Sequence, residues 1–142
     1  MKSRILAAAI LMGVNATATT LSCMDTKTFN YGRAKLINDG SGTVKVQLSS
    51  STLGLKLSDI VPLDVSYVTA TIEFPAGDCT ATGCIGSYPK MQVVAGGEKP
   101  IEVYLDKAAI QFQAAMVDYE LIGQNTKLVH AGIAVNQCST TP

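Results

Sequence analysis

Apolar and polar residues alternate along most of this chain, and this alternation restricts the possible folds more than any other feature. Val44, Val46 and Leu48 alternate with polar or charged residues. A period of two places one side of an extended strand in a core and the other toward solvent. Residues 31–37 precede this run, and the connecting residues 38–42 are of types that tolerate positive φ. The sequence therefore predicts a β-hairpin here.

The same alternation continues beyond the hairpin. It is strongest in residues 65–74, where the apolar side consists of Val68, Ala70, Ile72 and Phe74. Residues 108–121 are ambiguous, because their paired alanines also suit a helix, but Gln111 and Gln113 keep the alternation and favour a strand. Shorter runs predict strands at 53–57, 90–95, 101–105 and 127–136, with a turn or two of helix within 57–61.

These patterns define the fold class. Strands and helices do not alternate along the chain, so a parallel sheet is disfavoured. Short strands with turn residues between them are typical of antiparallel folds. We expect an all-β chain: a single-domain antiparallel β-sandwich or small β-barrel of about eight short strands, with disulfides.

The first residues have the order of a signal peptide. Lys2 and Arg4 precede an apolar run at 5–14, and small residues follow it. This run is too short to cross a bilayer. We expect cleavage after Ala18, with Ala16 as second choice, so that residues 1–18 are the leader and 19–142 form one β-rich domain in the periplasm or outside the cell. A bacterial source and the periplasm are the default reading. Lipid anchoring at Cys23 is disfavoured, because the leucine before it is out of register.

The chain has four cysteines, Cys23, Cys79, Cys84 and Cys138. An even number in an exported chain favours disulfides. Three pairings are possible; the local pair Cys79–Cys84 is the natural one and would leave Cys23–Cys138 to join the two ends of the domain. The spacing does not suit a zinc site, and a Cys-x-x-Cys redox motif is absent.

The charge balance excludes some partners. Eleven basic residues balance eleven acidic ones, and two of the basic residues fall in the leader. Neither a basic stripe nor a second long apolar run is present, so we expect no nucleic-acid partner and no transmembrane anchor.

No pattern of residues predicts catalysis, a metal or a cofactor. His130 is the only histidine and stands within a predicted strand without a nucleophile motif nearby. Asp118 and Glu120 share one strand face and have a spacing that a carboxylate pair would permit, but a solvated face explains them as well. Residues 39–43 resemble part of a calcium loop, yet the end positions of such a loop hold Ile37 and Leu48, so a hairpin turn is expected. We therefore lean against an enzyme.

Residues 75–90 are the most suggestive segment for function. They are rich in small residues and carry an apolar and an aromatic residue just outside the predicted disulfide. Such a loop would lose little entropy on binding. The candidate binding residues are Asp78, Thr80, Thr82, Ile85, Tyr88 and Lys90.

The class of the chain permits three functions. The first is a non-enzymatic exported module that binds another protein in the periplasm or extracellular space, in its most specific form an inhibitor of an extracytoplasmic hydrolase. The second is a structural or assembly subunit of the cell envelope, built by edge-to-edge strand pairing. The third is a small ligand- or lipid-binding barrel.

Overall fold

The computed structural model describes residues 18–28, 31–63, 67–97 and 99–142. The predicted leader, apart from Ala18, and the first residues of the predicted strand at 65–74 lie outside these ranges. The described residues form eleven strands. They are β1 (Thr19–Met24), β2 (Arg33–Asn38), β3 (Thr43–Ser50), β4 (Val68–Pro75), β5 (Cys79–Thr80), β6 (Gly83–Ser87), β7 (Lys90–Ala95), β8 (Ile101–Phe112), β9 (Met116–Gly123), β10 (Leu128–Ala134) and β11 (Gln137–Thr141). Helical segments are short: α1 (Leu53–Leu57), η2 (Ala76–Asp78) and η3 (Gln124–Thr126).

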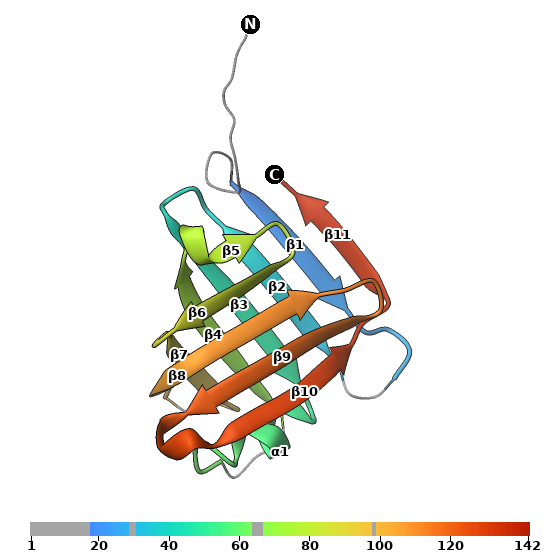
Figure 1. Cartoon of the computed structure of the whole chain (residues 1–142). Coiled ribbons are helices and arrows are strands. Elements are labelled where there is room, and N and C mark those ends of the chain that lie inside the picture. Colours follow the sequence, from blue (N-terminus) through green and yellow to red (C-terminus); the bar gives the residue numbers. More distant parts are fainter. Residues whose placement is uncertain (1–17, 29–30, 64–66, 98) are drawn as a thin grey trace, which may run out of the picture.

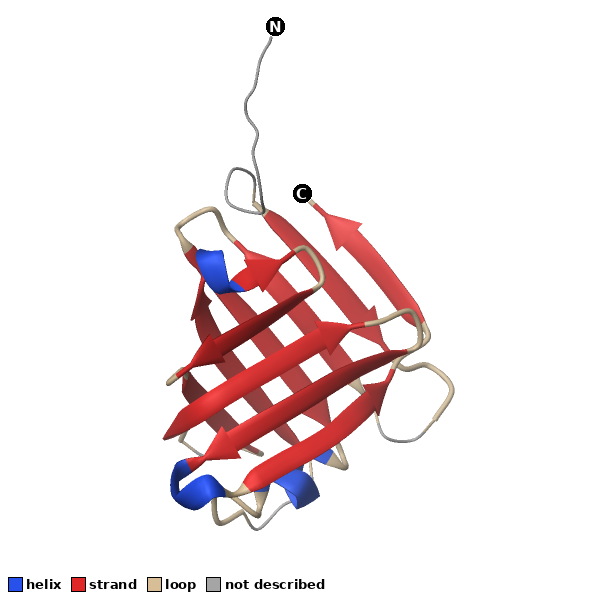
Figure 2. Ribbon diagram, in the orientation of Figure 1, coloured by secondary structure: helices blue, strands red, loops and turns tan. Residues whose placement is uncertain are grey.

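All strand pairs are antiparallel, and the sheet curls over on itself. The strand order is β10-β9-β8-β7-β4-β3-β2-β1-β11, with β6 paired to both β5 and β8. Figure 1 shows β6, β8, β9 and β10 as a front layer that crosses β1–β4 behind it, and Figure 2 shows how little helix accompanies the strands. The predicted all-β antiparallel fold is confirmed.

The long strand β8 joins the two layers. Its first part pairs with β7 in the register Lys90↔Tyr104, and its second part pairs with β6 in the register Ser87↔Lys107. A register shift between Leu105 and Lys107 separates the two parts. Irregularities of this kind bend a strand and increase its twist, which lets one strand belong to both layers.

The core lies between the layers and consists of the inward-facing residues that the alternation identifies. In β3 and β4 the predicted apolar sides are buried as expected. They meet inward residues of β7, β8 and β9. The largest fully buried side chains are Phe74, Leu48, Leu53, Leu57, Ile72, Met91, Leu105 and Leu121. Burying side chains of this size contributes about 1.5–3 kcal/mol each to folding.

Both predicted disulfides are present. Cys23 is bonded to Cys138, and Cys79 to Cys84. In each case the two cysteines stand directly opposite one another on paired strands, β1 with β11 and β5 with β6. The first disulfide joins strands 115 residues apart in sequence.

The turn between β2 and β3 has the geometry of a hairpin connection. Gly40 and Gly42 have positive φ values, 81° and 96°. The carboxylate of Asp39 accepts a hydrogen bond from the backbone N–H of Ser41 at 2.9 Å, and hydrogen bonds from Ser41 lower the pKa of Asp39. The aspartate is thus part of the turn that the sequence predicts.

Two predicted elements are wrong in detail. Residues 53–57 form helix α1, not a strand, and the helix precedes the predicted range 57–61 by one turn. Leu53 and Leu57 are buried while Leu55 is 66% exposed, because residues four apart share a helix face whereas alternate residues do not. The predicted single strand at 108–121 is two strands, β8 and β9, separated by a tight turn in which the N–H of Gln113 donates to the carbonyl oxygen of Met116 at 2.9 Å.

The strand count also differs from the expected eight. The additional strands are β1 and β11 at the two ends of the domain and β5 and β6 within the segment 75–90. Over the described ranges, no helix is both long and apolar enough to cross a membrane.

Candidate functional site

The segment 75–90, where sequence analysis places the candidate binding residues, is largely ordered by pairing. It leaves β4 at Pro75, passes through η2, and returns as the short hairpin of β5 and β6 closed by Cys79–Cys84. Strand β6 then pairs with β8 from Gly83↔Gln111 to Ser87↔Lys107. The prediction of a disulfide-closed segment is confirmed, but residues 83–87 of it form an added strand of the front layer and not a free loop.

Two glycines allow β6 to lie very close to its neighbours. A Cβ atom at Gly83 would lie 2.4 Å from the carbonyl oxygen of Ile110, which is closer than real contacts allow. A Cβ at Gly86 would lie 3.0 Å from the Phe74 ring and 3.1 Å from Oδ2 of Asp78. Glycine is therefore required at these two positions by the close approach of β6 to β8 and β4.

Tyr88 stands in the turn between β6 and β7, and it is the most exposed of the large apolar or aromatic residues described, at 79%. Its φ is 58°, a left-handed value that is rare for a bulky residue, and Pro89 follows it. Its N–H donates to the carbonyl oxygen of Asp106 at 3.0 Å, and the N–H of Leu105 donates to that of Pro89, also at 3.0 Å. Both bonds attach this turn to the irregular part of β8, so the ring projects from a fixed backbone.

A cleft of about 410 Å³ lies beside this turn. It gathers three of the predicted residues, Asp78, Tyr88 and Lys90. Its remaining walls come from the β2–β3 turn, the end of β4 and β6: Gly42, Thr43, Glu73, Phe74, Pro75, Gly86, Ser87 and Pro89. Aromatic, acidic and basic groups thus border one opening.

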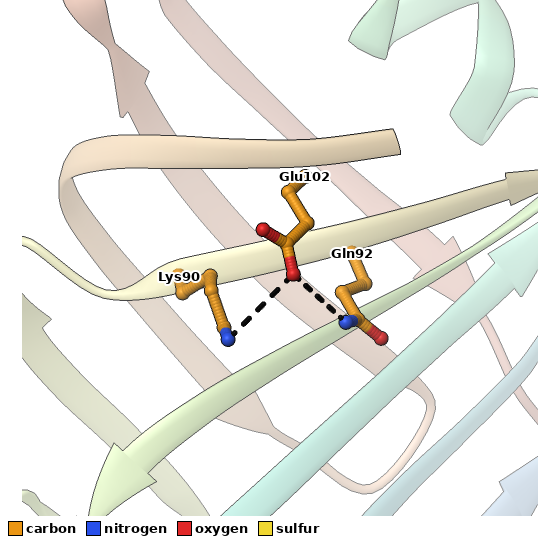
Figure 3. A network of polar contacts seen from close by, with 3 residues as sticks. All are labelled: Lys90, Gln92 and Glu102. Atoms are coloured by element: carbon orange, nitrogen blue, oxygen red, sulfur yellow. Dashed lines mark hydrogen bonds and ion pairs between the residues drawn. The ribbon is translucent and has the colours of Figure 1, made fainter. Parts of the chain in front are cut away.

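The position of Lys90 is set by neighbours on β7 and β8. Its Nζ lies 3.7 Å from Oε2 of Glu102, and the same oxygen accepts a hydrogen bond from Nε2 of Gln92 at 3.3 Å (Figure 3). The lysine and glutamate side chains remain 40% and 49% exposed, and an exposed pair of this kind contributes little to stability. The network orients the lysine at the border of the cleft while leaving it open to a partner.

Ile85 belongs to a second surface hollow, of about 240 Å³, on the outer face of the front layer. The pairing register puts four of its residues in one row across four strands: Ile85, Ala109, Glu120 and His130. Asp118 and Gln111 border the same hollow. The small side chain of Ala109 lies between larger neighbours in this row, which accounts for the depression.

The structure thus brings Ile85 close to residues that no sequence pattern connects to it. Asp118 and Glu120 do share the outward face of β9, and His130 stands directly opposite Glu120. Oδ2 of Asp118 accepts a hydrogen bond from Nε2 of Gln113 at 2.7 Å. The strand register that brings these residues to Ile85 has no signal in the sequence.

The two threonines of the candidate set make hydrogen bonds within the segment and to β8. Oγ1 of Thr82 accepts a hydrogen bond from Nε2 of Gln111 at 3.1 Å, and its carbonyl oxygen accepts one from the N–H of Phe112 at 2.7 Å. Oγ1 of Thr80 accepts a hydrogen bond from the N–H of Thr82 at 3.3 Å. Neither threonine is among the residues that line the cleft or the hollow. They stabilise the β5–β6 turn against β8.

The acidic residues within the described ranges and the histidine are not grouped as metal ligands would be. Across the described parts of the chain, no three histidine, cysteine, aspartate or glutamate side chains are placed so that they could hold a metal ion.

The chain matches no protein-family model, no curated protein and no solved structure.

Proposed function

We propose that residues 19–142 act as a non-enzymatic binding module outside the cytoplasm, and that the module engages another protein through the turn at Tyr88 and the adjoining cleft. The observation that carries this proposal is the exposure of Tyr88 on a backbone fixed by its hydrogen bonds to β8. Aromatic anchors contribute much of the energy at protein interfaces. A prearranged anchor avoids part of the ordering cost of binding.

The surroundings of Tyr88 support a protein partner. Asp78 and Lys90 border the same cleft and offer charges of both signs. Ile85, 62% exposed, adds an apolar contact on the neighbouring outer face of β6. An exposed aromatic ring with apolar and charged groups around it has the composition of a binding region. Inhibition of an extracytoplasmic hydrolase is the most specific form of this function, since a rigid projecting turn suits insertion into a substrate cleft.

Export is part of the proposal and has two supports. One is the order of basic, apolar and small residues in the leader. The other is the pair of disulfides, which persist in oxidising compartments.

The test is to recover partners with the oxidised protein from the envelope and growth medium of its host, and then to measure their affinity for variants. Tyr88→Ala should weaken binding by at least about ten-fold, the loss expected of an anchor residue. Tyr31→Ala is the matched control, because Tyr31 is also exposed, at 61%, and has a positive φ, but does not line the cleft. Equal affinity of Tyr88→Ala and the parent protein, with unchanged thermal stability, would remove the proposal.

A second candidate, the assembly subunit, is favoured by one specific observation. Strand β11 pairs on one side with β1, and all of its residues are exposed. A free strand edge of this kind is a template for pairing with another chain. No comparable observation favours the ligand-binding barrel, because large side chains fill the space between the two layers.

A further inference from the structure

We propose that two copies of this chain associate through the free edge of β11, in an antiparallel pairing centred on Ser139. The strand comprises Gln137–Thr141 and has neither a charged residue nor a proline within it. Natural proteins commonly protect an edge with charges, prolines or bulges. In Figure 1, β11 lies on the opposite side of the molecule from the labels of β6 and β7. The turn between these two strands carries Tyr88, so this surface is separate from the proposed binding region.

The backbone groups that face outward from β11 follow from the pairing of β1. The N–H of Asp25 donates to the carbonyl oxygen of Gly32 at 2.8 Å, just beyond the paired residues Met24 and Arg33. Hydrogen-bonded positions alternate along an antiparallel ladder. Cys23 therefore directs its backbone groups toward β2, whereas Ser22 directs its own toward β11.

The same alternation then applies to β11. Ser139 stands opposite Ser22, so its backbone groups are bonded to β1. Cys138 and Thr140 must then point their N–H and C=O groups away from β1. Cys23 and Cys138 are thus a non-hydrogen-bonded pair. Their Cα separation of 4.1 Å agrees with this assignment, because non-hydrogen-bonded pairs are about 4.5 Å apart and hydrogen-bonded pairs about 5.5 Å.

A two-fold axis at Ser139 would satisfy all of these outward groups. It places Cys138 of each copy opposite Thr140 of the other, and each such pair exchanges two backbone hydrogen bonds. Ser139 then faces its own equivalent, and Gln137 faces Thr141. No charged side chains meet. An isologous contact of this kind closes after two copies.

Alternative pairings are less suitable. A pairing centred on Cys138 would require the N–H of Asn136, which already donates to the carbonyl oxygen of Met24 at 2.9 Å. A second edge strand, β10, is partly covered: α1 packs against it, and Gly32 lies so close to Ile133 that an added Cβ would be 2.6 Å from Cγ2 of that side chain. A third, β5, has only two residues. The disulfide Cys23–Cys138 meanwhile holds β11 in place on β1, so the edge is already ordered before it pairs.

The contact is small, so a weak, concentration-dependent dimer is expected. Sedimentation of the oxidised protein up to about 1 mM should show a monomer–dimer equilibrium. Ser139→Lys and Ser139→Glu each place like charges opposite one another and should weaken the dimer by about five-fold or more. A mixture of the two variants should restore it as a heterodimer. Ser41→Lys, in the exposed β2–β3 turn, is the matched control and should dimerise like the parent.

A backbone test separates loss of pairing from loss of folding. Thr140→Pro removes an outward N–H that β1 does not use, and proline is tolerated on an edge strand in that orientation. It should abolish the dimer while the melting temperature of the monomer stays within a few degrees of the parent. A parent protein that remains monomeric at about 1 mM would overturn the proposal. So would a dimer that persists in Thr140→Pro, or species that grow beyond two copies, which would indicate pairing of β11 with β10.

Discussion

Cys23 lies directly opposite Cys138, with a Cα separation of 4.1 Å, although 115 residues separate them in sequence. Cys79 and Cys84 are also directly opposite one another, but only five residues apart. The two disulfides therefore have similar local settings and very different loop lengths. In the chain-entropy model the loop length determines how strongly a crosslink restricts the unfolded chain.

Replacing Cys23 and Cys138 together by alanine should lower the free energy of unfolding by about 4–5 kcal/mol. The same change at Cys79 and Cys84 should lower it by about 2 kcal/mol, because its loop is short. Urea unfolding of the two oxidised double variants measures both values. Equal losses would show that strain or residual structure outweighs the loop entropy. Loss of the longer crosslink should also release β11 and weaken the association of two copies.

Alanine at Gly83 should be far more damaging than alanine at Gly77. The added methyl group at Gly83 would press on the Ile110 carbonyl oxygen, and β6 would have to move away from β8. We expect a loss of about 2–3 kcal/mol. At Gly77 nothing lies within 4 Å of the added group, so alanine there should be neutral or stabilise by up to about 1 kcal/mol. Chemical unfolding of both variants tests this difference, and similar stabilities would contradict the close packing of β6 against β8.

The sequence alone was sufficient to predict the central strands but not the strands at the edge of the sheet. In β3 and β4 one face is buried, so the apolar alternation reports the fold directly. Strand β11 is exposed throughout and contains no apolar alternation, and β1 is only partly covered. The turn between β8 and β9 escaped prediction because Ala114 and Ala115 carry no turn signal. The helix α1 was missed because the spacing of its leucines fits both the two-residue period of a strand and the 3.6-residue period of a helix.

The candidate site was predicted in part for a similar reason. The exposure of Ile85 and Tyr88 follows from their places in a polar, small-residue segment, and both are exposed. Their assignment to two different surface features depends on the pairing of β6 with β8. That pairing joins residues about two dozen positions apart, and no local pattern specifies such a register.

Asparagine at Tyr88 should stabilise the fold while removing the proposed anchor. Its φ of 58° is strained for a bulky residue, whereas asparagine tolerates this region. Little packing is lost, because the tyrosine is 79% exposed. We expect the free energy of unfolding to rise by roughly 0.5–1 kcal/mol. Tyr104→Asn, in extended β8, is the control and should not raise it. A destabilised Tyr88→Asn variant would mean that the ring makes stabilising contacts.

Stability should fall at alkaline pH because of Tyr119. Burial raises the pKa of this phenol to about 12, whereas in an unfolded chain a tyrosine titrates near 10. Between these values the unfolded chain releases the proton and the native protein keeps it, so the stabilising difference present below about pH 10 is lost as the pH rises toward 12. At pH 11, midway between the two pKa values, the loss should be about 1–1.5 kcal/mol. Denaturant unfolding at pH 8 and pH 11 measures it. Tyr119→Phe should show a smaller decrease, and an equal decrease in this variant would contradict the assignment to Tyr119.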